Sequence, residues 1–210
     1  MRSSDNLTPR RKRLWEMLRF AVPRNIRWFY EGHPALRGQL WYAERKLLYQ
    51  CIREYRPAAC FEIGTWKGGG STLFISQALH DNGHGHLHTI EIDRALRDEA
   101  LRKYHEYLPH LDPFVTFHLG DYRERYKEVL EGIGGVDFLI LDGPEDAAET
   151  VRQYEFFHPY MKQGTVLMAH DWFTEKARLL RPLLTEENSW RILKILTPPA
   201  SVGLALAIRQ

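Results

Sequence analysis

The fold is decided by the stretch FEIGTWKGGGST, residues 61–72. An apolar run from Ala58 to Ile63 leads into a loop with four glycines, and an apolar pattern with helical spacing follows at once. A strand, a glycine loop and a helix in this order let backbone N–H groups face a ligand, because glycine allows unusual φ values and close approach. We therefore expect a ligand-binding loop at the start of a βαβ unit.

The composition of this loop favours a cationic ligand over a phosphate. Its glycines match neither the dehydrogenase pattern G-x-G-x-x-G nor the G-K-[ST] ending of a phosphate-binding loop. Glu62 stands just before the loop, where a carboxylate would repel a pyrophosphate but suit an ammonium or sulfonium group. The pattern thus argues against NAD and ATP.

Four more apolar runs alternate with helical patterns, as in a doubly wound parallel sheet. Polar residues stand at the end of each run, and the runs cover residues 87–93, 114–119, 136–141 and 165–169. An acid at the end of the second strand of a βαβ unit accepts hydrogen bonds from ribose hydroxyls, which makes Glu91 the expected ribose ligand. Because open α/β sheets bind ligands at the carboxyl ends of their strands, these polar residues should share one site.

Five segments in this order resemble the class I S-adenosylmethionine-dependent methyltransferases, especially their small-molecule O-methyltransferase branch. The segments are FEIGTWKGGGST, LHTIEID, FHLGDY, VDFLILDG and MAHDW. The resemblance implies an α/β fold with a doubly wound, Rossmann-like, seven-stranded sheet that is mostly parallel and has an antiparallel last strand. The final two strands would then be Ile192–Leu196 and Val202–Ile208.

The resemblance also assigns the parts of S-adenosylmethionine to residues. Glu62 would meet the ammonium group directly or through water, and Glu91 would meet the ribose. Asp121 and Tyr122 would border the adenine, although a purely structural role stays open for these two. The loop would contact the methionine end through a further set of residues: Gly64, Thr65, Gly68, Gly70 and Ser71.

For the acceptor side, the resemblance points to residues after the fourth and fifth strands. Metal-dependent relatives place their ligands there, and the matching positions are Asp142, His170 and Asp171. These three are the candidate catalytic residues and the candidate ligands of Mg²⁺ or another divalent cation. Relatives often carry a histidine shortly after the Asp-Gly pair, whereas this chain has Pro144 and Glu145. A metal-free site, with His170 as the base, therefore stays open.

Length and composition fit one domain with a substantial core, at 210 residues and a net charge of +2. Residues 36–210 form the expected cofactor-binding domain, and Cys51 and Cys60 are expected to be reduced core residues. No apolar run approaches the ~18 residues of a membrane span, and no signal-peptide pattern is present, so we expect a cytoplasmic protein.

Residues 1–35 differ from the rest in being basic, aromatic and interrupted by prolines. We expect a short basic helix at residues 9–20, followed by a segment that closes over the acceptor as a lid. A nucleic-acid-binding arm and a solvated basic face are the alternatives. The lid would use four rings: Trp28, Phe29, Tyr30 and His33.

The sequence predicts methyl transfer from S-adenosylmethionine to a hydroxyl group of a small molecule. An acceptor made of RNA or protein, a non-catalytic cofactor-binding relative and an oxidoreductase with a Rossmann cofactor are the alternatives. We expect no membrane partner, regard nucleic acid as the weaker partner class, and leave a homo-oligomer open.

Overall fold

The computed structural model describes residue 33 and residues 35–143, 145–186, 188–199 and 201–210. The predicted basic helix and most of the predicted lid lie outside these residues. Of the lid residues only His33 is described, and its ring lies against the ring of Tyr107. Among the described residues, no helix is both long enough and apolar enough to cross a membrane.

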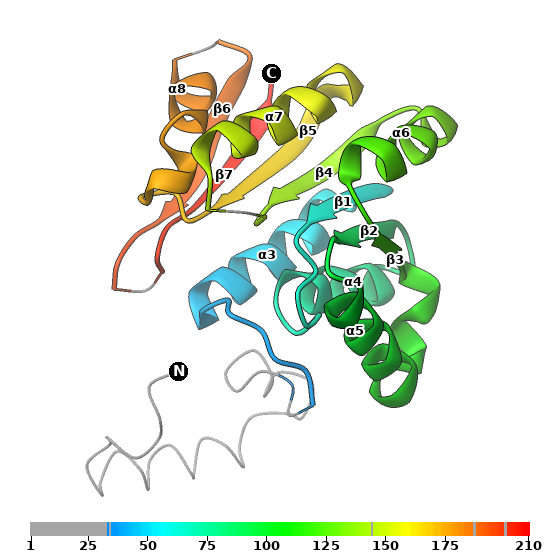
Figure 1. Cartoon of the computed structure of the whole chain (residues 1–210). Coiled ribbons are helices and arrows are strands. Elements are labelled where there is room, and N and C mark those ends of the chain that lie inside the picture. Colours follow the sequence, from blue (N-terminus) through cyan, green and yellow to red (C-terminus); the bar gives the residue numbers. More distant parts are fainter. Residues whose placement is uncertain (1–32, 34, 144, 187, 200) are drawn as a thin grey trace, which may run out of the picture.

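Seven strands form one sheet in the order β3-β2-β1-β4-β5-β7-β6 (Figure 1). Pairs among the first five strands are parallel, and β7 runs antiparallel to both of its neighbours. The predicted sheet with its antiparallel last strand is confirmed. The strands are β1 Ala59–Ile63, β2 His86–Glu91, β3 Val115–Leu119, β4 Val136–Leu141, β5 Met161–His170, β6 Trp190–Leu196 and β7 Leu204–Arg209.

Helices cover both faces of the sheet (Figure 1). One face packs against α3 Tyr42–Tyr55, α4 Ser71–Asn82, α5 Arg94–Tyr107 and the short 3-10 helix η2 Pro109–Phe114. The other face packs against α6 Tyr122–Ile133, α7 Ala147–Phe157 and α8 Leu180–Thr185, with two short 3-10 helices, η3 His158–Tyr160 and η4 Glu175–Ala177. Because both faces are covered, all five residues of β1 are buried, as continuous apolar strands require.

The topology opens a crevice at the carboxyl ends of the central strands. β1 pairs with β2 on one side and with β4 on the other, so the helices that follow β1 and β4 leave toward opposite faces. Ligands bind at such a switch point in open α/β sheets. The segment before α3 also reaches this crevice, since the N–H of Gly69 donates to the carbonyl of Arg37 at 3.0 Å. A Cβ on Gly38 would lie 2.0 Å from the carbonyl oxygen of Gly69, so only glycine allows this crossing.

Acidic residues after the strands begin the next helices. The side chain of Asp93 accepts hydrogen bonds from two backbone N–H groups at the start of α5. Asp121 caps α6, and Asp146 caps α7, as the capping-box-like sequence of residues 146–149 predicts. Such caps satisfy N–H groups that have no partner within the helix.

The helical spacing of Val151, Tyr154, His158 and Met161 predicts that all four lie on the interior face of α7, which is wrong for the last two. α7 ends at Phe157, so His158 lies in η3 and Met161 already lies in β5. The physical reason is Pro159, which lacks an N–H and cannot continue a helix. β5 therefore starts at Met161, before the predicted start at Thr165. Cys51 and Cys60 are buried free thiols, as predicted.

Candidate active site

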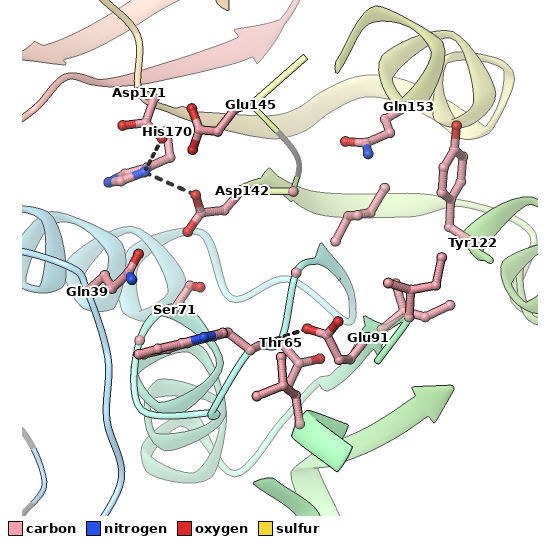
Figure 2. Close-up of a pocket in the computed structure, with 18 of the residues that line it drawn as sticks. Gln39, Thr65, Ser71, Glu91, Tyr122, Asp142, Glu145, Gln153, His170 and Asp171 are labelled. Atoms are coloured by element: carbon pink, nitrogen blue, oxygen red, sulfur yellow. Dashed lines mark hydrogen bonds and ion pairs between the residues drawn. The ribbon is translucent and has the colours of Figure 1, made fainter. Parts of the chain in front are cut away.

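A cavity of about 780 Å³ lies at the carboxyl ends of β1 to β5. Figure 2 shows Thr65 and Glu91 on one side of it and the group of Asp142, His170 and Asp171 on another. Ten of the twelve residues predicted for the site line this cavity: Gly64, Thr65, Gly70, Ser71, Glu91, Asp121, Tyr122, Asp142, His170 and Asp171. The other two, Glu62 and Gly68, do not line it.

Glu62 lies beneath the glycine loop and is fully buried. Its Oε2 accepts hydrogen bonds from the hydroxyls of Thr72 and Thr89, each at 2.6 Å. The hydroxyl of Thr89 also lies 2.5 Å from that of Thr65, which lines the cavity. Glu62 thus does not line the cavity and is linked to it through Thr89 and Thr65, so of the two predicted routes to an ammonium group the arrangement favours the indirect one.

Gly68 faces the protein interior. A Cβ at this position would lie 3.1 Å from the ring of Tyr104, and the backbone has a φ of +72°. The hydroxyl of Tyr104 donates to the carbonyl of Gly68 at 3.0 Å. Glycine is required here by the packing of α5 against the loop, and not by the approach of a ligand as the sequence suggested.

Glu91 holds the glycine loop in place through its carboxylate. Its Oε2 accepts from the N–H of Trp66 at 2.8 Å, and its Oε1 accepts from the N–H of Asp93 at 3.0 Å. Each carboxylate oxygen has a second lone pair, so both can still accept a hydrogen bond from a ligand.

The first turn of α4 is open to the cavity. Its cap residue is Gly70, which has no side chain to bond the N–H groups that follow, and the first turn contains no acid. Gly70 and Ser71 both line the cavity. Unsatisfied N–H groups and the helix dipole favour a negative group at this point.

Asp121 and Tyr122 also line the cavity, but each has a structural partner. The carboxylate of Asp121 pairs with the guanidinium of Arg123, which lowers the pKa of that acid. The hydroxyl of Tyr122 donates to Glu149 at 3.0 Å. Burial, followed by the carboxylate of Glu149, raises the pKa of Tyr122 well above its usual range. Both residues therefore shape the wall whether or not they touch a ligand.

The acceptor-side residues form a compact charged group with two residues that the sequence reasoning missed. Nδ1 of His170 lies 3.0 Å from Asp142 and 3.3 Å from Asp171, and the two dashed lines at His170 in Figure 2 mark these contacts. Nε2 of His170 lies 3.4 Å from Glu44 of α3, and the ammonium of Lys176 lies against Asp142 and Asp171. The contacts of His170 are ion pairs that lack hydrogen-bond geometry.

The charge of His170 follows from these neighbours. Burial by itself would lower the pKa of His170, but the carboxylates of Asp142, Asp171 and Glu44 outweigh it and raise that pKa to about 12. The imidazole is therefore protonated at neutral pH and has no lone pair to receive a proton. This arrangement does not support the predicted alternative in which His170 is the base.

A sequence signal existed for one of the two missed residues. Apolar residues recur at helical spacing from Leu40 to Tyr55 and predict a helix there. Glu44 stands four residues from both Leu40 and Leu48, on the apolar face of that helix, and a charge there indicates a buried partner. Glu44 is indeed fully buried and accepts hydrogen bonds from the N–H of Trp41 and the hydroxyl of Ser201. Lys176 follows Asp171 by five residues in an irregular segment, where spacing gives no such signal.

Residues 61–172, more than half of the chain, match the model of a family described as methyltransferase domain. The chain belongs to this family. The predicted resemblance to class I S-adenosylmethionine-dependent methyltransferases is confirmed, and the protein is a methyltransferase of that class.

Solved structures share the fold of this methyltransferase. A putative O-methyltransferase from Klebsiella pneumoniae is 19% identical with a TM-score of 0.68, and the match covers 94% of this chain and 96% of that one. A putative caffeoyl-CoA O-methyltransferase from Staphylococcus aureus is 19% identical with a TM-score of 0.66, over 97% and 100% of the two chains. An O-methyltransferase from Bacillus cereus in complex with SAH is 18% identical with a TM-score of 0.65, over 99% and 94%. No curated protein matches the methyltransferase in sequence.

The buried acid gives the methyltransferase a predicted pH dependence. Burial raises the pKa of Glu62 to about 7, although hydrogen bonds from hydroxyls partly oppose it. Because the folded-state pKa lies above the ordinary value of 4.5, the stability that the neutral acid contributes is complete below pH 4.5 and is lost as the pH rises through about 7. The free energy of unfolding of wild type relative to Glu62→Gln should therefore fall by about 3 kcal/mol across this window. Urea unfolding at a series of pH values measures this difference, with the exposed Glu128→Gln as control, and a flat difference for Glu62→Gln would refute the assignment.

Two histidines should differ in charge at neutral pH. His170 is expected to be an imidazolium, whereas burial, aided by His86 and His118, lowers the pKa of His88 to about 4 and leaves it neutral. Ring-nitrogen chemical shifts in an NMR titration distinguish the two forms, with His170→Gln and His88→Gln used for assignment. A neutral His170 at pH 7 would contradict the charge arrangement of the site.

Proposed function

We propose that this methyltransferase transfers the methyl group of S-adenosylmethionine to a hydroxyl group of a small molecule. One observation carries the proposal: a single cavity is lined by the open first turn of α4 and Glu91 at one part of its wall and by Asp142, His170 and Asp171 at another. The first part suits a zwitterionic, ribose-containing cofactor, and the second suits a polar acceptor group.

The cofactor half of the cavity complements S-adenosylmethionine in charge. The first turn of α4 suits the carboxylate of the methionine end, and Glu91 retains lone pairs for the ribose hydroxyls. Glu62 would act on the ammonium group through Thr89 and Thr65. The cofactor supplies an activated methyl group on its sulfonium.

The acceptor half has to orient a hydroxyl group in line with the methyl group and manage its proton. Asp142 and Asp171 line the cavity with carboxylates, which can accept a hydrogen bond from the hydroxyl and fix its direction. As the hydroxyl oxygen bonds the methyl carbon and the methyl–sulfur bond breaks to leave S-adenosylhomocysteine, the hydroxyl proton passes to one of these carboxylate oxygens. Charged His170 contacts both carboxylates through Nδ1 and keeps them close to each other. Gln39, Trp41 and Val202 also line the cavity and would border the acceptor.

The residues predicted as metal ligands have donor atoms within 4.8 Å of one another, close enough to share an ion. However, Oδ1 of Asp142 and Oδ2 of Asp171 already contact the ammonium of Lys176, at 3.1 and 3.2 Å. A divalent cation would need these same oxygens at about 2.0–2.6 Å, which the buried lysine prevents in this arrangement. The residues therefore do not fit a bound divalent cation, and the proposed reaction uses none.

The charge of the cavity favours a small molecule over RNA. One arginine and His170 line it, against six acidic residues. These acids are Glu91, Asp121, Asp142, Glu145, Glu149 and Asp171. Nucleic-acid sites are positively charged because they neutralise phosphates. A homo-oligomer and a cytoplasmic location stay predictions from the sequence.

Loss of Glu91 should weaken cofactor binding. Glu91→Ala removes the expected ribose acceptor, so the binding free energy of S-adenosylhomocysteine should become less favourable by about 1.5–3 kcal/mol. Calorimetry measures this, with Glu128→Ala on the exposed face of α6 as the matched control. Binding of NADH in place of S-adenosylhomocysteine would refute the proposal.

Methyl transfer should be detectable with S-adenosylmethionine labelled on its methyl group. We expect labelling within a panel of catechols, phenols and sugar alcohols, and no labelling of RNA or protein. With the accepted compound, Asp142→Asn should lower turnover about a hundredfold, since misplacement of the reacting group costs this much, while the affinity for S-adenosylhomocysteine stays unchanged. Labelling of RNA or protein alone would replace the small-molecule acceptor by that class.

A further inference from the structure

Lys176 is a buried cation at the point where the predicted metal ligands meet. The side chain is 2% exposed, although lysine is almost never buried without a partner. Its Nζ lies 3.1 Å from Oδ1 of Asp142 and 3.2 Å from Oδ2 of Asp171. Nδ1 of His170 approaches the same two oxygens. The ammonium therefore bridges the two carboxylates that a divalent cation would bridge.

The chain after β5 is folded so as to deliver this ammonium. Asp171 has a φ of +55°, which turns the backbone sharply at the end of the strand. The N–H and the hydroxyl of Thr174 both bond the carbonyl of Asp171, at 2.9 Å. The N–H of Trp172 bonds the carbonyl of Gly203 at 3.0 Å, which ties the turn to the segment before β7. The turn continues into η4, and Lys176 points back from it toward Asp142 and Asp171.

The carboxylates of the group already have close partners. Asp142 and Asp171 lie against the ammonium of Lys176 and Nδ1 of His170, and Glu44 lies against Nε2 of His170. Buried carboxylates require such partners, because an unpaired charge out of water is costly. A doubly charged ion would stand beside an ammonium that is already in contact with its ligand oxygens and would be repelled by it.

We propose that Lys176 takes the place of a divalent cation in this methyltransferase: its ammonium keeps Asp142 and Asp171 together and directed at the cavity, so that the acceptor is positioned without metal. Lys176 does not line the cavity, so it acts through the two carboxylates and is a positioning residue. The inference rests on the proposed function for its meaning, but its test does not require turnover.

The test measures binding of Mn²⁺ alone, by the loss of the free-ion electron paramagnetic resonance signal, to wild type and to Lys176→Ala. Wild type should show no saturable site. Lys176→Ala removes the ammonium and leaves room for an ion, so it should bind Mn²⁺ at least about tenfold more tightly than wild type. The double variant Lys176→Ala with Asp142→Asn should lose that binding, which locates the ion at this group.

A matched control is available in Lys162→Ala. Lys162 also pairs with an aspartate, Asp137 at 3.2 Å, but its side chain is 69% exposed and it does not line the cavity. This variant should remain without a Mn²⁺ site. Affinity for S-adenosylhomocysteine is measured in parallel on each protein, because it reports the folded cofactor site and tests the proposed function separately.

Two results would overturn the inference. Wild type could bind Mn²⁺ at a site that Asp142→Asn abolishes, which would make the group a metal site despite Lys176. Alternatively, Lys176→Ala could retain its affinity for S-adenosylhomocysteine and gain no Mn²⁺ binding, which would make Lys176 a structural ion-pair partner only. If Lys176→Ala fails to fold, the wild-type measurement decides between a metal site and none.

Discussion

Burial of the sheet on both faces is the constraint on which the rest of this structure depends. Helices cover each side, so a polar side chain on a central strand has no access to water except at the strand ends. The polar residues therefore gather where β1 to β5 end, and the switch of helices between β1 and β4 opens that edge into a cavity. Charged groups gather at this edge because a charged group elsewhere on the sheet would be desolvated unless it found partners.

Glu62 is an exception, because it is a polar residue inside a central strand and not at the end of one. It sits inside β1 with no exposure, yet its carboxyl group is bonded by the hydroxyls of Thr72 and Thr89. These bonds connect the start of α4 and the neighbouring strand β2 to one point beneath the loop. The acid thus fixes the loop from below, and the threonine pair Thr89–Thr65 links it to the cavity.

The charged side chains around His170 lower the same cost of desolvation by pairing opposite charges. Asp142, Asp171 and Glu44 come from three different elements and face His170 and Lys176 at ion-pair distances. Removal of one partner from such a group is strongly unfavourable, so each member holds the others in place. The rigid placement of two carboxylates at the cavity wall follows from this mutual requirement.

The sequence by itself determined the order of strands and helices along the chain, the antiparallel last strand through family resemblance, and ten of the residues that line the cavity. Local patterns suffice for this, because burial on both faces produces unbroken apolar runs, and strand-end residues must then be polar. They did not indicate that Gly68 packs against Tyr104 of α5, or that Glu62 is buried under the loop and bonded by Thr72 and Thr89.

Only the tertiary structure decided the charge of His170 and the contact of Lys176 with Asp142. His170 could be read as a base or a metal ligand from its position after β5, but its charge depends on Glu44, which stands 126 residues earlier in the chain. Lys176 reaches Asp142 through a turn whose shape no periodic pattern records. The protonation and the ligand capacity of a buried group are set by the summed field of its spatial neighbours, and a linear sequence does not specify which side chains those are.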